Sequence, residues 1–174
     1  MQIKGIHHSA FRCRDAEETR AFYEDLLGLQ LACVVEGERE PGSGKPHPFV
    51  HLFFRMADGN FFAFFDAPLS ADDAKFAPVH AFDRHVAFEV GSLDELKAWQ
   101  AKFAAAGVPC FGEIDHDFVR SIYFYDPNGI PLEITARADG HDAIVAKEGE
   151  AARETLTAWA ERKARMTQPT AACA

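Results

Sequence analysis

Two histidines and one glutamate have the residue types and the placement that a metal site requires. His8 and His85 each open a segment of alternating, β-prone residues, as expected of a strand. Glu133 lies between Leu132 and Ile134, so on a strand its side chain points to the opposite face from two apolar neighbours. A neutral imidazole suits Fe, Mn, Ni or Zn, and a carboxylate inside a pocket is costly unless it is paired or metal-bound. These three residues predict one divalent metal.

A solvent-facing role is the alternative for each of these residues. A lone Glu on a half-exposed strand commonly faces water, and for Glu133 it is the combination with two strand-opening histidines that favours ligation. His7 must point away from His8 on a strand, which indicates a surface or supporting position. His47 and His51 are candidates only for polar contacts near a pocket mouth.

The elements that would position these residues recur along the chain. Each half reads strand, helix and three strands, and each begins near a histidine. Asp15 and Ser92 are the predicted N-caps of the two helices. The fold class is therefore α+β, with two tandem βαβββ modules that form a half-open barrel around the metal. The predicted divisions are a first module at 1–66, a linker at 67–83, a second module at 84–137, and a C-terminal helix and tail at 138–174.

The repeat also predicts how many ligands the chain supplies. When the turns at Gly59 and Gly129 are aligned, Ala63 falls opposite Glu133. Ala63 has no ligand atom, so a fourth protein ligand is missing. Two histidines and one carboxylate leave about three positions of an octahedral ion open, which suits Fe(II) binding a substrate and O₂ together.

Composition narrows the partners. The chain has 174 residues and a formal net charge of −9, which argues against nucleic acid or an anionic membrane. The four cysteines form no CxxC pair, and the N-terminus lacks the apolar core of a signal peptide, so a cytoplasmic protein with reduced cysteines is expected. Leu156 and Trp159 could dock the C-terminal helix on the core or on another subunit, and the last eight residues are expected to be frayed.

The paired modules, with the segments GIHHSAFRCRDAEETRAFYEDLLGLQL and RHVAFEV, resemble the vicinal oxygen chelate superfamily. That superfamily includes glyoxalase I, bleomycin-resistance proteins and extradiol catechol dioxygenases. The resemblance covers about residues 3–136.

A narrower resemblance lies in IDHDFVRSIYFYDPNGIPLE, which is similar to the extradiol ring-cleavage signature. His116, Tyr123, the Asp126-Pro-Asn-Gly129 turn and Glu133 fall at the positions of that motif. The resemblance implies an Fe(II)-dependent dioxygenase that binds a catechol or similar aromatic vicinal diol, with Mn(II), Ni(II) or Zn(II) as alternative metals. It further implies that His116 hydrogen-bonds the substrate oxygen and that Tyr123 stabilises the ring-derived intermediate.

One position departs from the extradiol pattern. Those enzymes usually carry a further acid–base histidine near the start of the fourth strand, where this sequence has Asn60. Asn60 can hydrogen-bond bound oxygen but cannot transfer a proton as histidine does. The abundant phenylalanines indicate an apolar aromatic substrate, with Phe53, Phe61 and Phe65 as the expected lining.

Two other functions remain open. A glyoxalase-type lyase or isomerase usually has a fourth carboxylate ligand, which Ala63 does not supply. A non-catalytic ligand-binding protein of the bleomycin-resistance type needs no metal triad. Whichever applies, the resemblance implies a homodimer, because the half-open barrels of this superfamily expose sheet edges and module faces that need cover.

Overall fold

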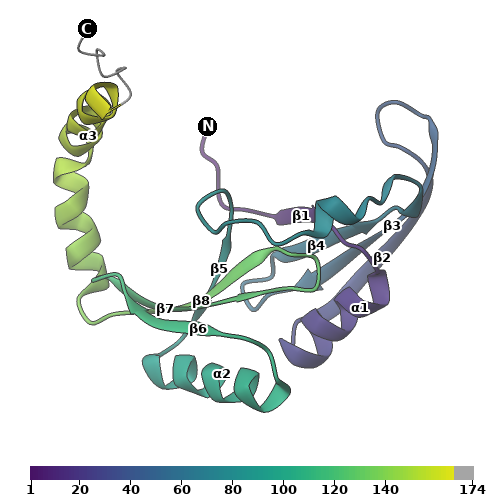
Figure 1. The fold of residues 1–174 in the computed structure, drawn as a ribbon, viewed down its shortest axis with the longest axis horizontal. Coiled ribbons are helices and arrows are strands. Elements are labelled where there is room, and N and C mark those ends of the chain that lie inside the picture. Colours follow the sequence, from purple (N-terminus) through teal and green to yellow (C-terminus); the bar gives the residue numbers. More distant parts are fainter. Residues whose placement is uncertain (167–174) are drawn as a thin grey trace, which may run out of the picture.

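The structure is a computed structural model that describes residues 1–166, and it contains both expected modules (Figure 1). The first consists of β1 (His8–Arg12), α1 (Ala16–Arg20), the π-helical turn η1 (Ala21–Leu26), β2 (Gln30–Arg39), β3 (Pro46–Arg55) and β4 (Phe61–Asp66). The second consists of β5 (Val86–Val90), α2 (Leu93–Ala106), β6 (Phe111–Asp115), β7 (Val119–Tyr125) and β8 (Pro131–Arg137). The α+β class and the repeated order of elements are confirmed.

Local capping explains where the helices begin. The Asp15 carboxylate accepts a hydrogen bond from the Glu18 amide at 2.7 Å, and the Ser92 hydroxyl accepts one from the Glu95 amide at 3.2 Å. Gly107 ends α2 with a φ of 69°, a left-handed conformation that glycine adopts without strain. Both predicted N-caps are confirmed.

The first helix differs from a continuous α-helix. From Ala21 onward it widens into a π-helical turn, and the Leu27 amide donates to the Phe22 carbonyl five residues earlier. The apolar residues of this segment come in neighbouring pairs, and over so few residues that spacing fits an α-helix and a π-helical turn equally well. The sequence pattern therefore could not distinguish the two. The turn places Tyr23 in the core with no exposed surface.

Each module forms one mixed sheet. The strand orders are β1-β4-β3-β2 and β5-β8-β7-β6, and in both sheets the first pair is parallel. Ala63 pairs with Ala10 and Phe53 in the first sheet, at the place where Glu133 pairs with Ala87 and Tyr123 in the second. The alignment of Ala63 with Glu133 is therefore confirmed by the register.

Strand alternation gives each sheet one core face and one open face. The core faces, with the two helices, bury a cluster that includes Tyr23, Phe54, Phe62, Phe64, Leu96, Phe103, Ile122, Phe124, Leu132 and Ile134. The aromatic contact between Phe62 and Phe88, whose ring centroids are 5.3 Å apart, joins the two modules. The open faces carry the predicted site residues.

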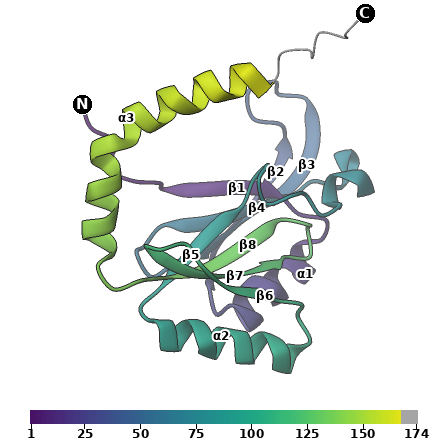
Figure 2. The ribbon, with the colours of Figure 1, turned by 60° about the vertical axis from the view of Figure 1, so that its left-hand side comes forward.

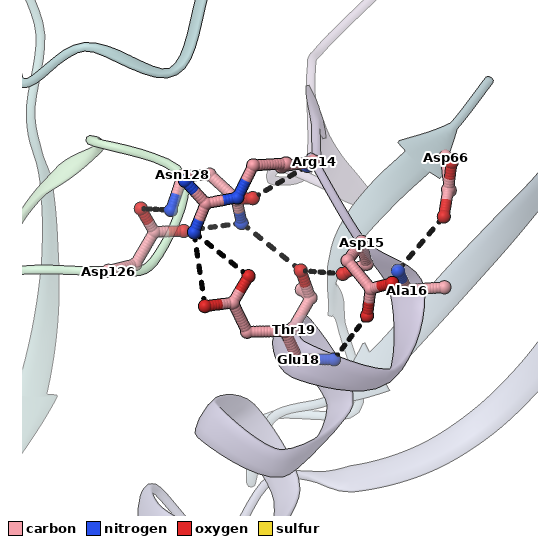
Figure 3. A network of polar contacts seen from close by, with 8 residues as sticks. All are labelled: Arg14, Asp15, Ala16, Glu18, Thr19, Asp66, Asp126 and Asn128. Atoms are coloured by element: carbon pink, nitrogen blue, oxygen red, sulfur yellow. Dashed lines mark hydrogen bonds and ion pairs between the residues drawn. The ribbon is translucent and has the colours of Figure 1, made fainter. Parts of the chain in front are cut away.

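A buried polar network also joins the modules (Figure 3). Asn128, in the β7–β8 turn, accepts a hydrogen bond from the Arg14 amide at 2.8 Å and donates to the Thr19 hydroxyl at 3.2 Å. Asp126 accepts from Asn128 and from the Tyr23 hydroxyl. Burial raises the pKa of Asp126, while these hydrogen bonds act in the opposite direction. These hydrogen bonds thus hold the β7–β8 turn of the second module against α1 of the first.

The connector and the C-terminal helix complete the described chain. Residues 67–83 include two short 3₁₀ turns, η2 (Pro68–Ser70) and η3 (Asp73–Phe76), and Phe76 is buried. The long α3 (His141–Met166) extends away from the sheets and has no buried residue (Figures 1 and 2). Leu156 and Trp159 are exposed, which rules out their docking on the core of this chain.

The structure bears on a membrane-spanning helix, whereas it does not describe the last eight residues. Among residues 1–166, no helix combines the length and the apolar character that crossing a bilayer requires. The expected fraying of the last eight residues, and Cys173, lie outside the described residues.

Candidate functional site

The open face of the second sheet forms one wall of a cleft of about 1220 Å³. His85, His116, Tyr123 and Glu133 all line it. Every lining residue falls between positions 80 and 135, so within one chain the cleft belongs to the second module and the end of the connector.

Glu133 lies at the centre of the second sheet, on β8. Its neighbours Leu132 and Ile134 are buried on the core face, and its own side chain points to the open face, as predicted. The Glu133 side chain is nevertheless only 7% exposed. A carboxylate with so little access to water requires a positive or hydrogen-bonding partner.

His85 supplies that partner. It directly precedes β5, and its Nδ1 lies 2.8 Å from the carbonyl oxygen of Ala81. Because a carbonyl only accepts, Nδ1 carries a hydrogen, and the other ring nitrogen, Nε2, points at Oε2 of Glu133 from 3.3 Å. With Nδ1 as the donor, the lone pair of Nε2 faces the Glu133 carboxylate, an arrangement that a metal cation between the two atoms would stabilise.

This arrangement fits a divalent metal. A ligating histidine commonly donates its second ring N–H to a backbone carbonyl, which fixes the tautomer and the ring orientation. His85 already makes that bond to Ala81, and Nε2 and Oε2 converge from two adjacent strands. The chain therefore provides one imidazole and one carboxylate in the form that ligation needs.

Tyr123 and His116 lie beside this pair. Tyr123 is directly opposite Glu133 in the β7–β8 register, and its ring centroid is 6.5 Å from that of His85. A hydrogen bond of 2.8 Å joins the Tyr123 hydroxyl to Nε2 of His116. Burial and the negative charge of Glu133 raise the pKa of Tyr123, so its hydroxyl remains protonated near neutral pH.

His8 is not brought to this cleft within the chain. It lies on the open face of the first sheet, with its Nδ1 2.9 Å from that of His7 and its ring centroid 5.7 Å from that of Phe53. The prediction that His7 points away from His8 is therefore wrong, because His7 precedes β1 and does not follow the alternation of a strand. Across residues 1–166, no group of three histidine, cysteine or acidic side chains is close enough to hold a metal. Two of the three predicted ligands thus lie together and the third lies apart, so the full ligand set stays a prediction.

The remaining predicted site residues are also on the first sheet. Phe53, Phe61 and Phe65 point to its open face, the same face as His8. Asn60 is in the β3–β4 turn, where its amide groups donate to Asp58. None of these four residues lines the cleft of the second sheet.

Sequence reasoning missed part of the surroundings. The cleft is also lined by Phe111, Phe118 and His80. These three residues were not predicted because their spacing in the sequence does not indicate a shared site. His51 stacks on Phe65 with ring centroids 3.6 Å apart. Its Nε2 is buried without a hydrogen-bond partner in the described chain, and burial, together with the nearby His8, lowers its pKa.

Comparisons with known proteins agree with this fold. The model of the Glyoxalase/Bleomycin resistance protein/Dioxygenase superfamily matches residues 5–134. The uncharacterized protein YwkD of Bacillus subtilis (strain 168) is 34% identical over 143 residues, which are 77% of this chain and 98% of YwkD. Biphenyl-2,3-diol 1,2-dioxygenase of Paraburkholderia xenovorans (strain LB400) is 26% identical over 132 residues, which are 75% of this chain and only 40% of that enzyme.

Solved structures show the same architecture. The fosfomycin resistance protein FosX of Listeria monocytogenes, in a complex with Mn(II) and sulfate, superimposes with a TM-score of 0.56 at 22% identity, covering 79% of this chain and 95% of FosX. Lactoylglutathione lyase of Agrobacterium tumefaciens gives a TM-score of 0.55 at 22% identity, covering 78% of this chain and 95% of the lyase. At such identities the likeness concerns the fold. On the family match, which spans both modules, this chain belongs to the glyoxalase/bleomycin resistance protein/dioxygenase superfamily.

Proposed function

We propose that this protein is an Fe(II)-dependent extradiol-type dioxygenase that cleaves the ring of a catechol or similar aromatic vicinal diol. The observation that carries the proposal is the convergence in one cleft of a ligand pair, His85 and Glu133, with a proton-handling pair, Tyr123 and His116. The similarity to biphenyl-2,3-diol 1,2-dioxygenase supports this chemistry over others in the superfamily.

The proposed metal ligands are Nε2 of His85, the carboxylate of Glu133, and His8. When bound, a divalent metal with three protein ligands supplies a Lewis acid with open positions for small ligands. Ala63, at the position that matches Glu133, offers no fourth ligand, which favours an open site over the more fully ligated site of a lyase.

His8 reaches this site from a second copy of the chain in our proposal. Each chain carries His8 on one open face and the His85–Glu133 pair on another. In a two-fold symmetric dimer both faces are used twice, so two equal sites form from complementary halves. The same pairing would bring Phe53, Phe61 and Phe65 to the substrate.

Tyr123 and His116 handle protons in this account. Their side chains lie 2.8 Å apart, so a proton leaving a substrate hydroxyl can pass to Nε2 of His116, either directly or through the Tyr123 hydroxyl, which takes up that proton as it gives its own to His116. Because burial and the charge of Glu133 raise the pKa of Tyr123, its hydroxyl is protonated near neutral pH and can donate a hydrogen bond to a substrate oxygen that becomes anionic. Apolar rings at the cleft, such as Phe111, offer an apolar surface to an aromatic substrate.

Oxygen uptake tests the proposal. Protein purified anaerobically and loaded with Fe(II) should consume one equivalent of O₂ for each catechol cleaved, as followed with an oxygen electrode and by the absorbance of the ring-opened product. Tyr123→Phe, loaded with iron to the same level, is the matched control and should consume O₂ about 10²–10⁴ times more slowly. Turnover of a glyoxalase-type substrate without O₂ uptake would replace the proposal by the lyase reading.

A further inference from the structure

A second pocket, of about 510 Å³, lies on the first module, away from the cleft of the second sheet. The connector closes one side of it and the open face of the first sheet the other. Its polar lining includes Arg12 on β1, His47 on β3, and Ser70 and Lys75 from the connector. The rings of Phe49 and Phe65 form its apolar wall.

Ser70 holds the three basic side chains together. Its hydroxyl accepts a hydrogen bond from the Arg12 guanidinium and lies 2.9 Å from Nε2 of His47. Its carbonyl oxygen accepts from the Lys75 ammonium at 2.8 Å. Segments far apart in the sequence thus bring their nitrogen groups to one point, with the Arg12 fork half-buried.

The positive charge at this point is not neutralised in the described chain. Within residues 1–166 neither Arg12 nor Lys75 forms an ion pair with a carboxylate, whereas Arg14, Arg20, Arg120 and Arg137 each do. Glu40 also lines the pocket, but its carboxylate accepts a hydrogen bond from Ser43. Two positive charges therefore face one negative charge, in a chain whose net charge is −9.

The pocket is continuous with the face that carries His8. Arg12 follows His8 by four residues on β1, so both point to the open face, about 13 Å apart along an extended strand. Phe65, which pairs with Arg12 across the sheet, lines the pocket and stacks on His51. The rings of Phe65 and His51 thus form an aromatic surface that extends from the pocket towards His8, the proposed metal ligand.

We propose that this pocket binds the oxyanion end of a small molecule, a carboxylate or a phosphoryl group, whose apolar part lies along Phe65 and His51. Within residues 1–166 the Arg12 guanidinium donates only to Ser70, so the rest of its planar fork can match two oxygens of such a group, and Lys75 adds a point charge. If the proposed function holds, on which this extension rests, the substrate is an aromatic diol with an acidic side chain.

Binding measurements on the full chain test the pocket without any catalytic step. The probes are 4-phenylbutanoate, the uncharged 4-phenylbutan-1-ol and inorganic phosphate, titrated by calorimetry at low salt without added metal. The variants are Arg12→Gln and Lys75→Gln, with Lys97→Gln on the exposed side of α2 as the control of equal charge change. A purely structural role for the cluster would lower the melting temperature of Arg12→Gln without any binding by the parent protein.

The acid should bind at least about tenfold more tightly than the alcohol, because hydrogen bonds to charged groups are the stronger ones. Arg12→Gln and Lys75→Gln should each weaken the acid about tenfold or more, and Lys97→Gln should leave it unchanged. Competition by phosphate would identify a phosphoryl group as the better fit, and its failure a carboxylate. If Arg12→Gln does not fold, Lys75→Gln decides, since Lys75 is exposed.

Equal binding of acid and alcohol, an equal loss in Lys97→Gln, or no saturation below about 10 mM would overturn the proposal. These outcomes are separate from the test of the dioxygenase. If the acid binds but no catechol is cleaved, the oxyanion pocket stands and the dioxygenase proposal falls. If a catechol is cleaved but the acid does not bind, the dioxygenase proposal stands and the oxyanion pocket falls.

Discussion

The hydroxyl of Tyr123 and Nε2 of His116 form a hydrogen bond of 2.8 Å on the same wall of the cleft as Glu133. His116 lies in the loop between β6 and β7, and Tyr123 is on β7 directly across from Glu133. The two side chains therefore meet beside the proposed ligands without either needing to contact a metal.

Tyr123→Phe and His116→Ala should each keep the metal and lose turnover. The loss expected for one acid–base group is about 10²–10⁴ in rate. Metal content by elemental analysis and kcat with a cleavable catechol, measured on the same samples, check this. A lower melting temperature with intact turnover per metal would instead assign the pair a structural role.

A homodimer should form at micromolar concentration. The open sheet faces and the unburied α3 leave apolar groups such as Leu156 and Trp159 exposed to water, and a second copy would cover them. Light scattering should give twice the chain mass. A monomer at that concentration would remove both the dimer and the shared site.

Mixing two inactive variants should restore activity if the site is shared between chains. A dimer of one His8→Ala chain with one Glu133→Ala chain has one intact site, since the second chain supplies His8 to the first chain's His85 and Glu133. Co-expressed chains carrying different tags, purified as the mixed dimer, should recover about half of the parent activity. Each homodimer alone is the control, and no recovery would place the whole site in one chain.

Asn128→Ala should destabilise the protein through its position between the modules. Removing its amide leaves the Arg14 amide and the Thr19 hydroxyl without these partners, a loss of about 1–3 kcal/mol in the free energy of unfolding. In a chain of this size the melting temperature falls by about 2–4 °C for each kcal/mol. Ser43→Ala, in an exposed loop, should change the melting temperature little, and an equal effect of the two variants would deny the network this role.

Much of the fold could be predicted because its signals are local. The caps at Asp15 and Ser92, the turn at Asp58-Gly59 and the period-2 pattern around Glu133 are properties of short segments, and the structure confirms them. The repeat extended this to register, since it placed Ala63 where the sheet has it.

The grouping of site residues could not be predicted in the same way. His8 and His85 open equivalent strands, which fixes their places within each sheet but not the distance between the two sheets. That distance depends on how the core faces pack, through contacts such as Phe62 with Phe88. The pocket around Arg12 could not be predicted from the sequence, because its residues come from three separate segments.

Metal analysis tests the central claim most directly. The parent protein, loaded anaerobically with Fe(II) and desalted, should hold one iron per chain, and His85→Ala and Glu133→Ala should hold less than about a tenth of that, because each loses one of three ligands from an open site. Circular dichroism should show both variants folded, since apolar strands and not the ligands form the core. Full iron in folded Glu133→Ala, or none in the parent protein, would contradict the account.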